Sequence, residues 1–342
     1  MTPRGARVRP QPPRARGALT GTIEMKSRLI LNPVSGADDA PELLRAMNER
    51  LRGRVGDMDI VMTVAPGDAE HAGEQAARER YDHLFVAGGD GTLNEVLNGA
   101  ARVPGALARI TFGLIPFGTG NDFATSLGLP TTLSGTLDVL LEGHTVHADL
   151  GLLDERCFVN VSAGGFIAEV SDAVSPHLKT VAGRLAYLIG GASVLREHEP
   201  VRTHIRARGG ERPFEREMDL TLFAVCNARM VGGGRLIAPR AEIDDGLLDV
   251  CLVEPMKTLE FIALLRRISD GHHLDDARVT YFRASDVELA FDQTTRVNTD
   301  GEVLDRAACH YRVLPRAARF LAGRASIVPS DGIDPGLARD ED

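Results

Sequence analysis

The sequence has no long apolar segment and little cysteine. Apolar residues never run for the roughly 18–20 positions that a bilayer-spanning helix needs, and we expect no secretory signal. The four cysteines, Cys157, Cys226, Cys251 and Cys309, stand far apart and lack the paired spacing of a metal site. We therefore expect reduced thiols in a protein core, as is usual in a cytoplasmic protein.

Positive charge is not in excess either. The chain has 39 lysines and arginines against 48 aspartates and glutamates, a formal net charge of −9, so nucleic-acid binding has no electrostatic support. Apolar residues make up 43% and charged residues 25%, which is typical of a globular protein. A length of 342 residues is enough for two domains.

Two glycine-rich turns, at residues 88–92 and 118–122, are the most informative segments. Each follows a short apolar, strand-like run, and each precedes a helix-like segment. Strand, glycine turn and helix bring backbone N–H groups and a helix N-terminus against a phosphate, and glycine allows the close approach. Two ordinary turns would be the simpler interpretation, but the repeated arrangement favours a phosphate-binding site.

Each turn also contains a carboxylate, Asp90 in the first and Asp122 in the second. These carboxylates would repel a bare phosphate unless a cation lay between them, so the pair predicts a nucleotide bound with Mg²⁺. The alternative for Asp122 is a helix N-cap after Asn121, and both roles can coexist. No Gly-Lys-Ser/Thr Walker sequence is present, so the phosphate cradle is not a P-loop.

The pattern of elements changes near residue 147. Before it, strands alternate with helices, which predicts a doubly wound α/β domain over residues 26–147. Ligands of such sheets bind beyond the carboxyl ends of the strands, where both glycine turns lie. From 148 to 313 strand-like runs predict a β-sandwich. The runs are 156–162, 201–207, 217–226, 247–253, 278–283, 286–291 and 309–314, with helices expected near 166–174, 181–196 and 257–269.

The helix expected at 181–196 has an apolar stripe. A face packed on the core explains such a stripe, and the alternative is a helix that lines a cleft for an acyl chain.

Both ends of the chain are polar. Residues 1–25 carry five arginines and four prolines, and residues 325–342 are acidic. Such segments cannot bury enough apolar surface to offset their ordering entropy, so we expect two disordered tails. The basic tail could serve as an arm for anionic lipid, or Met25 could be the true beginning of the protein.

Five segments carry a resemblance to a known family. In chain order, across roughly residues 26–324, the sequence resembles the diacylglycerol kinase catalytic-domain family, in particular soluble bacterial lipid kinases. That family shares its nucleotide fold with sphingosine kinases and, more remotely, with NAD kinases and phosphofructokinases. The resemblance implies that residues from about 314 to 324 return to complete the nucleotide domain. The matching segments are Asn32-Pro33-Val34-Ser35-Gly36, Gly88–Glu95, Pro116–Ala124, Ile243–Asp249 and Asp300-Gly301-Glu302.

The resemblance implies the residues that bind ATP. They belong to the first glycine turn, the end of the second strand and the second glycine turn. They are Thr63, Gly88, Gly89, Asp90, Gly91, Thr92, Leu93, Asn94 and Thr119.

Glu302 is the predicted general base. Judged from the sequence alone, it reads as a solvated glutamate in a tight turn. In the resembling kinases the matching glutamate is the proposed base, and a carboxylate beside the lipid hydroxyl could take its proton. Asp90 is the alternative, because related sphingosine kinases are assigned an aspartate in the same turn. We therefore expect Glu302, Asp90 and Asp122 to be the catalytic residues.

The resemblance also implies a second, structural Mg²⁺ away from the chemistry. Its ligands would be the side chain of Asp245 and the backbone carbonyls of Glu242 and Leu247. Asp245-Gly246 alone would be an ordinary hairpin turn, and Asp244 could compete as the ligand.

Taken together, these residues predict a Mg²⁺-dependent kinase that uses ATP to phosphorylate diacylglycerol, giving phosphatidic acid. Phosphatidylglycerol and a sphingoid base are the alternative acceptors. NAD kinase activity is disfavoured by the predicted sandwich and the second glycine turn. A nucleotide-binding regulator without activity is disfavoured by the intact acids. We expect a cytoplasmic protein, peripheral to the inner face of the membrane, with ATP and a lipid as its partners. A homodimer is compatible with this prediction.

Overall fold

The computed structural model describes residues 25–35, 41, 44–46, 49–50, 58–118, 120–166 and 199–324. Thr119 and nearly all of the two expected tails lie outside the described residues. The helices expected near 166–174 and 181–196 also lie outside them, apart from Phe166.

Four parallel strands form the N-terminal part of the sheet. Their order is β2 (Met58–Met62), β1 (Ser27–Leu31), β3 (His83–Gly88) and β4 (Thr111–Pro116). β1 is buried at every position, and β3 and β4 are buried at all but one. Such continuous burial is typical of parallel strands covered on both faces.

Helices cover both faces of this parallel sheet. On one face, α2 (Asp68–Arg78) and α3 (Asp90–Ala101) pack on alternate residues of β3 and β4, which include Val86 and Phe112. On the other face, α6 (Leu133–Glu142) packs on Phe85 and Ile115. Short helices α4 (Ala106–Arg109) and α5 (Asp122–Ser126) and the 3-10 turn η1 (Pro33–Ser35) complete this region. The predicted doubly wound α/β fold is therefore confirmed.

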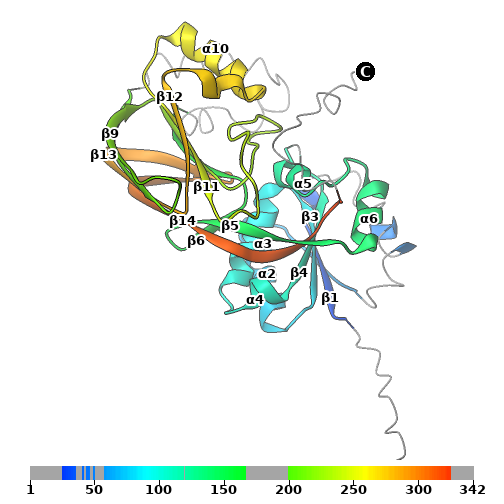
Figure 1. Ribbon diagram of the computed structural model, residues 1–342. Helices are drawn as coiled ribbons and strands as arrows, with labels where there is room; N and C mark the ends of the chain where they lie inside the picture. Colours follow the sequence, from blue (N-terminus) through cyan, green and yellow to red (C-terminus); the bar gives the residue numbers. More distant parts are fainter. Residues whose placement is uncertain are drawn as a thin grey trace, which may run out of the picture.

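Two long strands carry the sheet from this domain into the rest of the molecule (Figure 1). β5 (Thr145–Leu153) pairs antiparallel with the second half of β14 (Glu302–Leu321). The end of β14 pairs parallel with β4 through Arg319 and Phe320, so the last described strand completes the N-terminal sheet. The fourteen strands of the described residues belong to one hydrogen-bonded sheet.

The C-terminal part is antiparallel and folds over itself. One layer runs β12 (Val279–Ala284), β11 (Leu248–Val253), β10 (Leu222–Cys226) and β7 (Val161–Gly165). The other contains β8 (Val201–Arg208) and β9 (Phe214–Leu220), and the short β6 (Arg156–Phe158) pairs with β5. β13 (Asp286–Thr299) pairs with β8 through its first half and with β7 through its end.

An irregularity in β13 lets it join both layers. The register with β14 shifts between Ala290 and Thr295, as a β-bulge allows. A core that includes Ile205, Phe223 and Val250 lies between the layers. The helix α10 (Thr258–Ser269) covers the far side of β10 and β11 with Phe261 and Leu264, and η2 (His272–Asp275) follows it. The sandwich-like C-terminal domain was predicted correctly.

Two smaller expectations concern cysteine and membrane spans. All four cysteines are free and buried, as expected for core thiols. Within the part of the chain that the structure describes, none of the helices has the length and apolar character needed to cross a bilayer.

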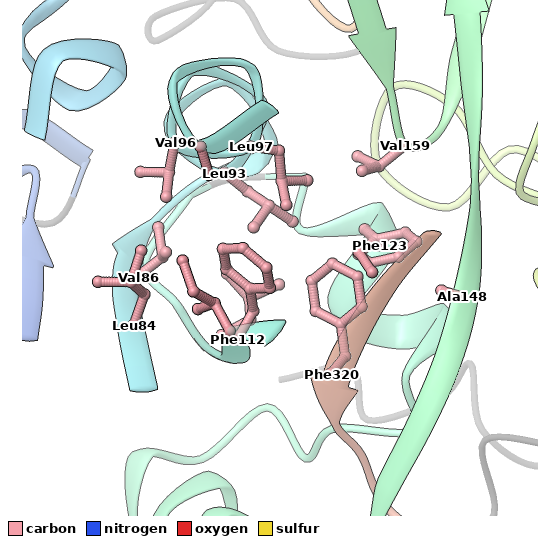
Figure 2. Close-up of a cluster of buried hydrophobic side chains, with 14 of the residues drawn as sticks. Leu84, Val86, Leu93, Val96, Leu97, Phe112, Phe123, Ala148, Val159 and Phe320 are labelled. Carbon is pink, nitrogen blue, oxygen red and sulfur yellow. The ribbon is translucent and has the colours of Figure 1, made fainter. Parts of the chain in front are cut away.

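Phe320 is the aromatic anchor between β14 and the N-terminal core (Figure 2). Its ring is fully buried, with centroids 5.6 Å from Phe112 and 5.1 Å from Phe123. We predict that Phe320→Ala lowers the free energy of unfolding by about 3–5 kcal/mol, because it removes buried contacts and leaves a cavity. Chemical denaturation would measure this. Leu259→Ala, at a side chain that is 81% exposed, is the control. A loss below about 1 kcal/mol for Phe320→Ala would show that the C-terminal strand contributes little to the core.

Candidate active site

The two glycine turns lie side by side at the carboxyl ends of β3 and β4. Gly88 and Pro116 are register partners, and the chain turns immediately after each of them. A Cβ added to Gly118 would lie 2.7 Å from the Cα of Gly89, closer than two such atoms can approach. The turns therefore touch through their backbones, and glycine at 118 is required by this contact.

Asp90 joins the first turn to the second. Its carboxylate accepts the backbone N–H of Asp122 at 2.9 Å and that of Phe123 at 3.1 Å, and the side chain of Asn160 also hydrogen-bonds to it. Asp90 therefore satisfies the first N–H groups of α5, which would otherwise lack partners. Burial raises the pKa of Asp90, while these donors oppose the shift.

Asp122 joins the second turn to the C-terminal domain. Its carboxylate is buried and accepts the backbone N–H groups of Gly233 at 3.0 Å and Gly234 at 2.7 Å. Gly232, Gly233 and Gly234 all have positive φ, so this loop needs glycine to present its N–H groups. We call these two hydrogen bonds the Asp122 latch. Asp122 is the first residue of α5, with Asn121 at the N-cap position, so the alternative N-cap role of Asp122 is wrong.

The turn before Glu302 is fixed against the first glycine turn. The partly buried carboxylate of Asp300 accepts backbone N–H groups from Val159, Asn160 and Val161 at 2.6–3.1 Å. It also accepts the side-chain amide of Asn94 at 3.1 Å. Burial is the main cause that raises the pKa of Asp300 to about 6, and the charge of Asp90 adds to it. The two turns are therefore close enough to interact electrostatically.

Glu302 itself remains accessible, because its side chain is 44% exposed at the start of β14. An ion pair with Arg156 orients it, with the guanidinium 2.9 Å from the Glu302 carboxylate. Arg156 also contacts Glu70 of α2 at 3.4 Å. A chain of charged side chains thus connects the candidate base to a helix of the N-terminal domain.

The remaining candidate residues of the first glycine turn differ in their exposure and in their side-chain contacts. Gly91 is exposed, and a Cβ added there would meet no atom within 4 Å. Thr92 accepts the side-chain amide of Asn32, and a Cβ at Gly88 would clash with it at 2.7 Å. Leu93 belongs to the hydrophobic core, so only its backbone can face a nucleotide.

Two further candidate nucleotide residues are buried. Asn94 is 7% exposed, and its side-chain amide is bonded to Asp300 and to the carbonyl of Cys157. Thr63 is 5% exposed and directly follows β2, where its N–H continues the ladder by bonding to the carbonyl of Leu31. Thr119 lies outside the described residues.

The candidate structural metal segment is rich in carboxylates. Asp245 accepts the N–H of Leu247 at 2.9 Å and pairs with Arg283 at 3.2 Å, and burial raises its pKa. Asp149 is fully buried and accepts the N–H groups of Gly246 and Arg316, both at 2.6 Å. Glu242 is partly buried in the same segment.

Asp249 has an incompletely satisfied carboxylate close to these acids. It is fully buried and accepts the hydroxyl of Tyr281, while its other oxygen has no hydrogen-bond partner among the described residues. Burial raises its pKa to about 7, and the charges of Asp245 and Glu242 contribute to the shift. Oxygen donors next to an unsatisfied buried carboxylate fit Mg²⁺, although Arg283 already neutralises part of the charge.

Sequence reasoning missed the groups that hold these turns together. Asp300 was part of a matching motif but received no role, and Arg156 and Asn160 stood in an ordinary strand-like run. The glycine triplet at 232–234 was a visible third glycine turn, and it is the one signal that could have pointed to the Asp122 latch.

Comparison with known proteins agrees with this architecture. A model of the diacylglycerol kinase catalytic domain matches residues 26–153, and a model of the YegS C-terminal NAD kinase beta sandwich-like domain matches residues 160–322. An α/β domain of this type followed by such a sandwich defines a two-domain lipid kinase.

Curated relatives give the family. A diacylglycerol kinase of Staphylococcus carnosus is 36% identical over 280 residues, which cover 82% of this chain and 89% of the relative. One from Bacillus subtilis is 32% identical over 278 residues, covering 81% and 89%. The chain therefore belongs to the diacylglycerol kinase family.

Solved structures support the fold. A diacylglycerol kinase structure from Bacillus anthracis superposes with a TM-score of 0.71 at 24% identity, covering 88% of this chain and 98% of that one.

The Asp122 latch makes a testable prediction. Asp122→Asn should destabilise the protein by about 1–3 kcal/mol, because a charged acceptor is lost and an amide offers one acceptor oxygen where the carboxylate offers two for the glycine N–H groups. Hydrogen exchange at Gly233 and Gly234 should accelerate in the variant. Asp305→Asn is the control, since that side chain is 67% exposed. Unchanged exchange at both glycines would show that the latch does not hold the loop in solution.

Proposed function

We propose that the protein is an ATP- and Mg²⁺-dependent diacylglycerol kinase, which transfers the γ-phosphoryl group of ATP to the free hydroxyl and gives phosphatidic acid and ADP. Membership of the family supports the lipid acceptor. The hydrogen bond from Asn94 to Asp300 is the structural observation that carries the proposal, because it places the turn of Glu302 beside the first glycine turn.

The nucleotide would lie over the carboxyl ends of β3 and β4. Backbone N–H groups of the first turn, from Gly88 to Asn94, would face the phosphates, with Thr63 and Thr119 contributing from the neighbouring strand end and turn. The open space at Gly91 and the close contact of Gly89 with Gly118 support such a site, since the described backbone at these glycines carries no side chain.

Asp90 and Asp122 are the proposed carboxylates for the catalytic Mg²⁺, which they would hold directly or through water. When bound, Mg²⁺ supplies neutralisation of the charge on the phosphates. Both side chains already accept backbone N–H groups, and each carboxylate retains lone pairs for a further partner. Their present hydrogen bonds would fix the oxygens in position before the nucleotide arrives.

Glu302 is the proposed general base. Its carboxylate would take the hydroxyl proton of the acceptor as the acceptor oxygen bonds to the γ-phosphorus and the bond to the leaving ADP oxygen breaks. The exposure of Glu302 supports this role, whereas Asp90 has both oxygens engaged with backbone donors. The ion pair with Arg156 would orient the carboxylate toward the acceptor.

The structural Mg²⁺ remains a separate proposal. The side chain of Asp245 and the carbonyls of Glu242 and Leu247 would hold it, and it would stabilise the segment between the loop and β11. Asp244 is exposed and is the competing ligand.

The acceptor lies in a bilayer, so we propose that the enzyme acts as a cytoplasmic protein at the membrane surface. Three exposed apolar side chains support this, because Val34, Met62 and Val64 stand at the carboxyl ends of β1 and β2, on the edge that bears the glycine turns. A homodimer stays a prediction.

A lipid panel tests the proposed activity. With radiolabelled ATP and Mg²⁺, we expect label in phosphatidic acid when diacylglycerol is offered in mixed micelles. Phosphatidylglycerol and a sphingoid base are the alternative acceptors, and NAD is included as the acceptor of the related nucleotide fold. Label in another lipid would identify that lipid as the acceptor in place of diacylglycerol. Label in NAD alone would overturn the assignment as a lipid kinase.

Glu302→Gln tests the base. The amide keeps the size of the side chain but cannot accept the proton, so kcat should fall by about 10²–10⁴-fold with ATP affinity near normal. Asp90→Asn should weaken the response to Mg²⁺ as well as the rate. Glu217→Gln, an exposed glutamate on β9, is the control. If Glu302→Gln stays within about threefold of wild type while chemistry limits the rate, Asp90 becomes the leading base.

A further inference from the structure

Three potential metal ligands outside the candidate active site lie together on the C-terminal sheet. Asp286 and Glu288 of β13 and His310 of β14 place ligand atoms within 4.8 Å of one another. Within the described residues this is the one such group of three histidine, cysteine or acidic side chains. Neither the family resemblance nor the proposed reaction uses any of them.

The strand register explains why these side chains meet. Glu288 is directly opposite His310 in the antiparallel pair of β13 and β14. Asp286 is two residues from Glu288 and therefore projects from the same face, and its carboxylate lies 3.0 Å from Nε2 of His310. Because backbone hydrogen bonds hold both strands, the three side chains start from fixed positions on one sheet.

We propose that Asp286, Glu288 and His310 form a binding site for a divalent first-row transition metal, such as Zn²⁺ or Co²⁺. Two carboxylate oxygens and an imidazole nitrogen suit these ions, whereas Mg²⁺ and Ca²⁺ favour ligand sets of oxygen alone. The side chains are between 32% and 44% exposed, so an ion can enter from solvent and water can complete its coordination.

The neighbouring charges permit this site but limit its affinity. Arg206 contacts Glu288 at 3.3 Å and Glu215 at 3.0 Å, so it keeps its closer partner when Glu288 turns to a metal. Arg208 and Arg312 are the register partners of Asp286, and their positive charges oppose a cation. His310 must give up its contact with Asp286 and present the Nε2 lone pair instead, with its proton on Nδ1.

The site is distant from the proposed chemistry. His310 lies about 25 Å along β14 from Glu302, at about 3.3 Å per residue. An ion that bridges β13 and β14 would therefore stabilise the C-terminal domain by binding only to the folded state. This role does not depend on the proposed function, and it can be tested without any kinase assay.

Cobalt binding to the untagged, full-length protein tests the proposal. Wild type should bind one more Co²⁺ than His310→Gln, with visible absorption bands that the variant lacks, and Zn²⁺ should raise the Tm of wild type but not that of His310→Gln. Glu288→Gln and Asp286→Asn should each weaken binding by at least about tenfold. His204→Gln is the matched control, because His204 lies on the neighbouring strand β8, 3.5 Å from Glu215 and outside the triad. It should bind as wild type does, and excess Mg²⁺ should not displace the ion.

Several results would overturn the proposal. One such result is that wild type binds no Co²⁺ at a concentration of about 100 µM, which corresponds to a binding free energy weaker than about −5.5 kcal/mol. His310→Gln could bind with unchanged stoichiometry and spectrum, or His204→Gln could abolish binding, which would place the metal elsewhere. Equal Tm values of the metal-free variants and wild type would establish that each loss reflects a ligand and not misfolding. The two carboxylate variants keep the test independent if His310→Gln fails to fold.

Discussion

Buried and partly buried aspartates that accept backbone N–H groups from distant segments hold this molecule together. Asp90 binds the start of α5, Asp122 binds the glycine loop, and Asp300 binds the connection between β6 and β7. Asp149 binds the turn at Gly246 and the irregular part of β14 at Arg316. A carboxylate removed from water is costly unless donors replace its hydration, and here backbone N–H groups supply them. The turns would otherwise present unsatisfied N–H donors at the edge of the sheet. The carboxylates therefore satisfy the N–H groups, and the N–H groups replace the hydration of the carboxylates.

These contacts also make the candidate site rigid before any ligand binds. Gly89 and Gly118 touch through their backbones, Asn94 reaches across to Asp300, and Arg156 pairs with both Glu302 and Glu70 of α2. A site held in this way loses little further freedom when substrates are ordered, which is how positioned groups accelerate a transfer reaction. The same carboxylates that build the loops are thus candidates for the chemistry.

Much of this fold could be predicted from the sequence, because apolar periodicity and glycine turns are local signals. The doubly wound domain, the sandwich-like domain and the adjacent turns all follow from them. The partners of the site residues could not be predicted, since the Asp122 latch joins residues far apart in the chain. Asn94 illustrates the limit, because its motif indicates a nucleotide ligand, whereas its side chain is buried against Asp300 and the carbonyl of Cys157. The site assignments themselves stay predictions.

The course of β14 has a consequence for biosynthesis. The strand that pairs with β4 is the last described element of the chain, and β5 pairs with that same strand through Val146 and Ala148. While the ribosome is still translating the C-terminal domain, the open edge of β4 has no partner, and Phe112 and Phe123 lack the ring that covers them. The sheet of the nucleotide domain, although encoded first, therefore cannot be completed until β14 has been synthesised. A nascent chain that stalls within the sandwich would expose the edge of β4. Exposed strand edges are bound by chaperones and promote aggregation.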